Sequence, residues 1–229
     1  MIDFTNTRAV IFDLDDTLYS RYLAAKKTFP GMLRDLLFEG RSEEFIERAT
    51  ALMMENVAEN SMVHERVFEA LMSAYPTDKP YDRAACLDYY YKYLPELAEP
   101  FPDTVATLEM LKERGIKLGI ITNTPTGRTA SQKRKVEVLG IAKYFDEIIY
   151  STECEYRKPD RRIYDMMADR LGVPSSECVF VGDDPASDIT GALNADMRAV
   201  FIDRFGHGDI YKDNPRVTRV NSLSEYFIK

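Results

Sequence analysis

The chain has 229 residues, of which 45% are hydrophobic and 30% charged, so it can bury a core in one large or two modest domains. Its net charge of -8 argues against binding a nucleic-acid polymer through a broad basic surface. We expect a cytoplasmic protein without a membrane partner, because no apolar run has membrane-spanning length and MIDFTNTR lacks a signal-peptide pattern. The three widely spaced cysteines fit core positions better than a disulfide framework or a zinc site: Cys86, Cys154 and Cys178.

The first predicted element is a buried strand over residues 8–13, which runs directly into a group of acids. Asp13, Asp15 and Asp16 follow four apolar residues in the stretch RAVIFDLDDTLYS. Neighbouring carboxylates make one another costly to ionise unless a cation or a proton lies among them. The stretch therefore requires something elsewhere in the fold to balance its charge.

Helical spacing of apolar residues follows over residues 19–97 and predicts about four helices. We expect Pro30-Gly31 to break the first helix and YPTDKP at 75–80 to form a loop. The fourth helix is a tyrosine-rich segment at 82–93. The apolar stripes of the first three helices are Leu33, Leu36 and Leu37; then Phe45, Ile46, Ala49, Leu52, Met53 and Val57; then Val63, Val67, Phe68, Leu71, Met72 and Tyr75.

Predicted helices and strands then alternate from about residue 103 to residue 202. Because the strands are apolar throughout, we expect a doubly wound α/β fold with a parallel sheet covered on both faces. Residues 1–18 and 98–229 form this core, and residues 19–97 form an inserted helical domain. The predicted helices cover about 103–114, 127–139, 160–171 and 186–194, and the predicted strands cover 116–121, 145–150, 178–181 and 198–202.

Polar side chains follow the strands, and the carboxyl ends of parallel strands meet at one crevice where ligands bind. The residues in these positions are Asp13, Asp15, Asp16 and Thr17; Thr122, Asn123 and Thr124; Lys158; and Gly182, Asp183, Asp184 and Asp188. Clustered carboxylates suit Mg²⁺, and a carboxylate is able to attack phosphorus while a second one transfers protons. An ammonium and a hydroxyl are suited to hold phosphoryl oxygens, so the set as a whole suits phosphoryl transfer.

In this order the residues resemble the four motifs of the haloacid dehalogenase superfamily of hydrolases. The first motif, DxDxT, is matched by Asp13, Asp15 and Thr17, and the second by Thr122 at the end of IITN. The third is matched by Lys158 in RKPD, and the final motif, GDxxxxD, by Gly182, Asp183 and Asp188. The resemblance extends from Arg8 to about Asp203.

The resemblance implies a Rossmann-like core with a helical cap inserted after the first motif. It implies that Asp13 is the nucleophile and Asp15 the general acid/base, with Lys158 and Thr122 binding phosphate beside the backbone N–H of Asn123. It further implies Mg²⁺ held by Asp13, the backbone carbonyl of Asp15 and Asp183, with Asp184 or Asp188 in the inner or outer coordination shell. The family's dehalogenases lack the second acid of the first motif, so Asp15 indicates a phosphatase.

Three interpretations of function remain open. The first is a Mg²⁺-dependent phosphatase that hydrolyses a small phosphorylated metabolite through an aspartyl-phosphate, in an oligomeric state that the sequence does not indicate. A phosphomutase or phosphotransferase would use the same motifs, and a non-catalytic binding protein would be expected to have lost one of the catalytic side chains.

Three further side-chain predictions concern residues around these motifs. We expect Asp16 to be structural, as an exposed acid or a loop anchor. We expect Thr17 to order its loop through local hydrogen bonds. The basic run Lys133-Arg134-Lys135 predicts an exposed helix face.

Overall fold

The computed structural model describes residues 6–57, 65–77, 81–204, 206 and 210–228. The chain divides into two compact units, one made of Met1–Tyr19 with Pro100–Lys229 and the other of Ser20–Glu99. All three cysteines are free thiols. Within the described part of the chain, no helix combines the length and the apolar character needed to cross a bilayer.

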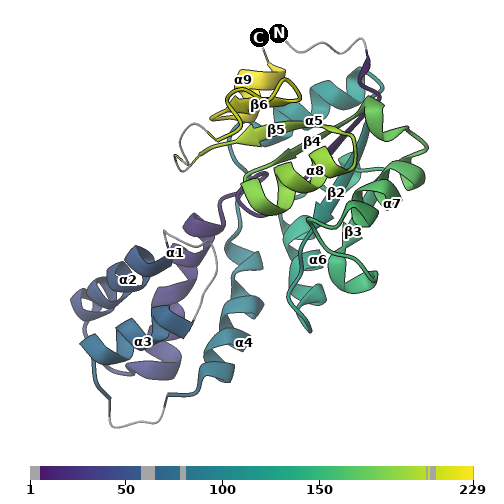
Figure 1. Cartoon of the computed structure of the whole chain (residues 1–229). Helices are drawn as coiled ribbons and strands as arrows, with labels where there is room; N and C mark the ends of the chain where they lie inside the picture. Colours follow the sequence, from purple (N-terminus) through teal and green to yellow (C-terminus); the bar gives the residue numbers. More distant parts are fainter. Residues whose placement is uncertain (1–5, 58–64, 78–80, 205, 207–209, 229) are drawn as a thin grey trace. The chain divides into compact units, whose positions relative to one another are not determined.

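The larger unit is built on a β-sheet with helices packed around it (Figure 1). The sheet has six strands in the order β3-β2-β1-β4-β5-β6, and every neighbouring pair is parallel. The strand order changes direction beside β1, which is the position where doubly wound sheets bind ligands. The predicted α/β fold with a parallel sheet is confirmed. The strands are β1 (Ala9–Phe12), β2 (Lys117–Thr122), β3 (Glu147–Tyr150), β4 (Cys178–Gly182), β5 (Arg198–Ile202) and β6 (Val217–Val220).

Helices cover this sheet, and short turns connect them to the strands. The helices are α5 (Thr104–Glu113), α6 (Thr129–Val138), α7 (Arg161–Leu171), α8 (Thr190–Asn194) and α9 (Leu223–Phe227). The turns are η4 (Ala142–Tyr144), η5 (Ser151–Glu153), η6 (Ser175–Glu177) and η7 (Pro185–Ile189). The segment predicted as one helix at 186–194 is thus a π turn, η7, that leads into the short helix α8.

The central strand β1 is buried along its whole length because its side chains alternate between two cores. Ile11 belongs to the hydrophobic cluster that also contains Tyr164 of α7 and Phe180 of β4. Phe12 faces the other way, with its ring 6.2 Å from that of Phe227 in α9. A strand covered on both faces requires apolar residues at every position, which is the pattern AVIF that β1 shows.

Two elements near the C-terminus, β6 and α9, are absent from the sequence prediction. The strand β6 has the sequence VTRV, in which only Val220 is buried. It lies at the edge of the sheet, so half of its side chains face solvent and its apolar signal is weak. The helix α9 (Leu223–Phe227) is capped by Ser222, whose side chain accepts a hydrogen bond from Glu225 N, and it packs against α5.

Every element described in the smaller unit is helical. The elements are α1 (Arg21–Met32), η2 (Leu33–Leu37), α2 (Glu43–Val57), α3 (Glu65–Ala74), α4 (Arg83–Tyr93) and η3 (Pro95–Leu97). Of the predicted features, Val63 and positions 78–80 of the loop lie outside the described residues.

Two details of the helical prediction are wrong. The helix α1 runs through Pro30 and Gly31 to Met32, since the buried side chains of Phe29 and Met32 hold it in place. Proline inside a helix removes one backbone hydrogen bond and crowds the carbonyl four residues earlier, so this packing has to offset its cost. Leu36, expected on the buried face, is 38% exposed, because the wider π turn η2 brings Leu37 to the side of Leu33.

We predict that Gly191→Ala destabilises the protein. Inside a helix alanine is normally more stable than glycine by about 1 kcal/mol, so the prediction runs against helix propensity. A Cβ atom at Gly191 would lie 2.4 Å from Tyr164 Oη and 2.5 Å from its ring. Tyr164 is buried and its hydroxyl donates to Ser187 O at 2.6 Å, so it has little room to move. We expect the free energy of unfolding, measured by urea denaturation, to fall by about 1–3 kcal/mol. Asn194→Ala, at an exposed position of the same helix, is the control, and equal effects would contradict the prediction.

Candidate active site

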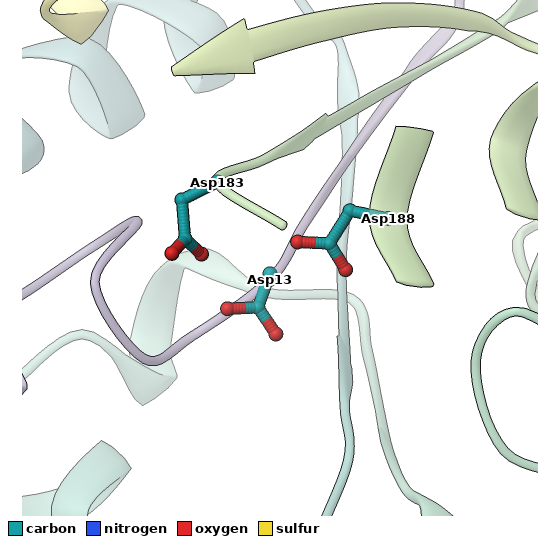
Figure 2. Close-up of side chains that lie close together, drawn as sticks. All are labelled: Asp13, Asp183 and Asp188. Carbon is teal, nitrogen blue, oxygen red and sulfur yellow. The ribbon is translucent and has the colours of Figure 1, made fainter. Parts of the chain in front are cut away.

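Three carboxylates meet at the carboxyl edge of the sheet (Figure 2). Asp13 directly follows β1, Asp183 directly follows β4, and Asp188 lies on η7. One oxygen from each lies within 4.8 Å of the others. The neighbouring parallel strands β1 and β4 bring Asp13 and Asp183 together, and Asp13 N donates to Val181 O at 2.8 Å.

Asp188 reaches this group because Gly182 leaves room for it. A Cβ atom at Gly182 would lie 2.3 Å from the Asp188 carboxylate, so a larger residue would displace the acid. Asp188 is buried, and its Oδ2 accepts from Asp184 N at 3.1 Å. Glycine in the final motif therefore has a packing role in addition to its place in the turn.

Lys158 is the buried cation that balances part of this charge. Its Nζ lies 2.5 Å from Asp13 Oδ1 and 2.7 Å from Asp188 Oδ1. Burial by itself lowers the pKa of Lys158, but the two carboxylates outweigh it and the net pKa is raised. Burial raises the pKa of Asp13 to about 7, against the opposing attraction of Lys158. Lys158 contacts two of the three carboxylates, and a cluster of carboxylate oxygens of this kind suits a divalent cation such as Mg²⁺.

Asn123 holds the loop that carries Lys158. Its Nδ2 donates to Lys158 O at 3.0 Å, and its Oδ1 accepts from Lys158 N at 3.0 Å. The prediction for Asn123 concerned its backbone N–H, and it stays a prediction, while the side chain bonds the backbone of Lys158. Asn123 directly follows β2, so these two hydrogen bonds join the end of β2 to the loop before α7 that carries Lys158.

Asp184 and Asp188, the two alternative metal ligands predicted in the final motif, have different surroundings. Asp184 Oδ1 accepts from the backbone N–H groups of Ala186 and Ser187, at 2.8 and 3.2 Å, so it caps the turn η7. Asp188 instead contacts Lys158 and joins the carboxylate group. Among the residues that the structure describes, this is the one group of three His, Cys, Asp or Glu side chains arranged to bind a metal ion.

Asp15 lies in a second polar cluster, formed with α6. Its Oδ1 accepts from Tyr19 Oη and lies 2.6 Å from Lys135 Nζ, and its Oδ2 accepts from Gln132 Nε2 at 2.5 Å. Gln132 Nε2 also donates to Thr122 Oγ1 at 2.7 Å. The hydroxyl of Thr122 acts as the acceptor there, which leaves its own proton able to bond an incoming oxygen.

Lys135 and Thr17 differ from their predicted surroundings, and the structure excludes one of the two alternatives for Asp16. Lys135, expected on an exposed face, is 4% exposed, because α6 turns it toward Asp15. Asp16 is buried, with φ of 62°, which excludes the exposed acid and leaves the loop anchor as the prediction for it. Thr17 Oγ1 donates to Asp183 Oδ1 at 3.2 Å and so reaches another strand end rather than its own loop.

Gln132 and Lys135 are the residues of this site that the sequence reasoning missed. They lie three positions apart on α6 and therefore on one face of that helix. Two polar residues at this spacing, just after a polar strand end, were the available signal. The neighbouring basic residues Lys133 and Arg134 obscured it, because they give the segment the composition of a solvated face.

Comparison with known proteins places this geometry in a family. Residues 7–196 match the haloacid dehalogenase-like hydrolases. The chain is 35% identical over 196 residues to a glyceraldehyde 3-phosphate phosphatase of Methanothermobacter thermautotrophicus, with 85% of each chain covered. The crystal structure of a HAD phosphatase from Thermococcus onnurineus is similar at 27% identity and a TM-score of 0.61, covering 96% of this chain and 95% of that one. A 2-haloacid dehalogenase from Pseudomonas syringae is similar at 28% identity and a TM-score of 0.60, with 96% of each chain covered.

The chain belongs to the haloacid dehalogenase-like hydrolases. It is a hydrolase, and the names of its relatives support phosphoric monoesters as the bonds that it cleaves. The Rossmann-like core expected from the resemblance is likewise confirmed.

We predict that Asn123→Ala lowers the free energy of unfolding by about 1–3 kcal/mol, because it leaves the N–H and C=O of Lys158 without their partner. Urea denaturation measures this effect. Asn221→Ala is the matched control: it removes an exposed asparagine of the same unit and is expected to change stability by less than about 0.5 kcal/mol. A loss no greater than that of the control would mean that the Asn123 side chain does not hold the lysine loop.

Proposed function

We propose that this protein is a Mg²⁺-dependent phosphatase that hydrolyses a small phosphorylated metabolite through an aspartyl-phosphate on Asp13. The observation that carries the proposal is the position of Asp13, which lies between the buried ammonium of Lys158 and the carboxylate of Asp183. A buried carboxylate with a cation on one side and a cation-binding group on the other is suited to receive a phosphoryl group. The proposal extends the hydrolase assignment to a mechanism and a substrate class.

In the first step, a carboxylate oxygen of Asp13 attacks phosphorus and the bond from phosphorus to the ester oxygen breaks. Asp15 gives its proton to that oxygen, so the product leaves as an alcohol. In the second step Asp15, now ionised, takes a proton from a water molecule as that water attacks the phosphorus of the aspartyl-phosphate. Inorganic phosphate leaves, Asp13 is again a carboxylate, and Asp15 again carries its proton.

Lys158 and Thr122 bind the phosphoryl oxygens in this proposal. Lys158 stays protonated, since its pKa is raised, and it offers a fixed positive charge next to the attacking oxygen. Thr122 offers its hydroxyl proton, because its oxygen already accepts from Gln132. Asp13, Asp183 and the backbone carbonyl of Asp15 would hold Mg²⁺, with Asp188 fixing Lys158 beside them. Bound there, the ion would supply charge that lowers the repulsion between the phosphate and the attacking carboxylate.

Support for a small phosphorylated substrate comes from the relatives, among them one named as a phosphatase of glyceraldehyde 3-phosphate. The presence of Asp15 favours hydrolysis of phosphate esters over dehalogenation, since an alkoxide requires a proton and a halide does not. Transfer of the phosphoryl group to an acceptor alcohol remains the second candidate. Product analysis with and without an added sugar distinguishes it, because hydrolysis releases inorganic phosphate in both cases.

The first test is turnover of an aryl phosphate in the presence of Mg²⁺. We expect the wild type to release phosphate, and Asp13→Asn to reduce turnover to background because the amide is not a nucleophile. We expect Asp15→Asn to lower kcat for an alkyl phosphate by about 10²–10⁴-fold, the usual contribution of a general acid/base. A wild type no faster than Asp13→Asn would reject the phosphatase proposal.

The second test asks which acids bind Mg²⁺. An ion at 100 times its dissociation constant stabilises the folded state by about 2.7 kcal/mol, which raises the thermal midpoint. We expect Asp183→Asn to remove this Mg²⁺ response. Asp184→Asn is its neighbour and control, because asparagine is also a good cap and Asp184 caps η7. A full response in Asp183→Asn, or loss of the response in Asp184→Asn, would overturn this assignment.

A further inference from the structure

We propose that Lys135 and Gln132 of α6 are positioning residues for the reaction, which hold the Asp15 carboxylate in its working orientation and link it to Thr122. The inference rests on the acid/base role of Asp15 in the proposed function. None of the four motifs includes either residue. Their contacts within the larger unit carry the inference.

The three side chains form a closed set of hydrogen bonds. Lys135 Nζ donates to Asp15 Oδ1 at 2.6 Å and to Gln132 Oε1 at 2.8 Å. Gln132 Nε2 donates to Asp15 Oδ2 at 2.5 Å. Each oxygen of Asp15 thus has its own donor from α6, so the plane of the carboxylate is fixed and not merely its position. Donors to both oxygens match the ionised carboxylate, which is the form that takes a proton from water in the second step. The amide orientation of Gln132 is consistent throughout, since its oxygen faces an ammonium and its nitrogen faces two oxygens.

Gln132 also connects Thr122, which binds a phosphoryl oxygen in the proposed reaction, with Asp15, which transfers the proton. Its Nε2 donates to Thr122 Oγ1 at 2.7 Å as well as to Asp15. The hydroxyl that binds a phosphoryl oxygen and the carboxyl that transfers the proton are therefore held by one amide. A proton transfer in the transition state requires this kind of fixed geometry, and small displacements cost large factors in rate.

The burial of Lys135 is a second observation in favour of this role. Its side chain is 5% exposed, whereas the side chain of Lys133, two residues earlier on the same helix, is 47% exposed and pairs with Glu153 at 2.5 Å. A buried ion pair has a large desolvation penalty and adds little stability compared with apolar packing. Stability alone therefore gives little reason to bury an ammonium there, whereas orienting a reacting carboxylate does.

Tyr19 is a further neighbour of Asp15. Its hydroxyl donates to Asp15 Oδ1, and Lys135 Nζ lies 5.6 Å from the centre of its ring. The aromatic ring limits the directions that the lysine side chain is able to take. Lys135 therefore contacts Gln132 as well as Asp15, and its ammonium lies near the Tyr19 ring.

The experiment is a double-mutant cycle between Lys135→Met and Asp15→Asn, with kcat measured for an alkyl phosphate. If Lys135 acts by orienting Asp15, Lys135→Met lowers kcat by about tenfold or more, with a smaller change in KM, when Asp15 is present. It has little further effect in the Asp15→Asn background, where there is no acid/base to orient. A lysine with a purely structural role would lower kcat by the same factor in both backgrounds, and that result would overturn the inference.

Gln132→Met is the second variant, so the test does not depend on Lys135→Met folding. It removes the donors to Asp15 and Thr122 and is expected to show the same non-additivity with Asp15→Asn. Thermal unfolding verifies that each variant is folded at the assay temperature. Lys133→Met, on the exposed side of α6, is the matched control and is expected to keep the wild-type kcat.

The outcomes separate the two proposals. A wild type without phosphatase activity rejects the proposed function. An active wild type in which folded Lys135→Met or Gln132→Met retains full kcat rejects only the positioning role. Loss of kcat that disappears in the Asp15→Asn background supports both.

Discussion

The structure of the larger unit depends on holding like charges together at the carboxyl edge of a parallel sheet. Asp13 and Asp183 directly follow neighbouring strands, which are hydrogen-bonded along their length, so the sheet fixes their backbones side by side. Lys158 is placed between Asp13 and Asp188 and stays charged because their attraction outweighs the effect of its burial. The remaining negative charge makes this edge suitable for a cation and, with it, for a phosphate.

The two acids of the first motif, Asp13 and Asp15, have different polar neighbours in this arrangement. Asp13 faces a lysine from the loop before α7, while Asp15 faces a lysine and a glutamine from α6. Two carboxylates with different neighbours are able to take different roles, one as nucleophile and one in proton transfer. The separation explains how two acids only two residues apart avoid competing for the same cation.

Much of the fold was predictable, because its signals are local. The strand predicted at 198–202 coincides with β5, and apolar runs of this kind predict buried parallel strands directly. Local signals failed where packing overrides them. Pro30 lies inside α1 because neighbouring buried side chains hold that helix, and β6 was missed because an edge strand needs few apolar residues. The prediction of an exposed face on α6 was correct for Lys133 and wrong for Lys135.

The sequence by itself determined the class of fold and which polar residues follow its strands, since both depend on short runs of neighbouring residues. Topology then makes those strand ends converge, which is why the candidate site was visible without coordinates. Only the tertiary structure decided the partner of each carboxylate: Lys158 with Asp13 across 145 residues, and Lys135 with Asp15 across 120. Such pairings depend on how a helix or loop is rotated against the sheet, and that rotation is set by packing over the whole unit rather than by any local pattern.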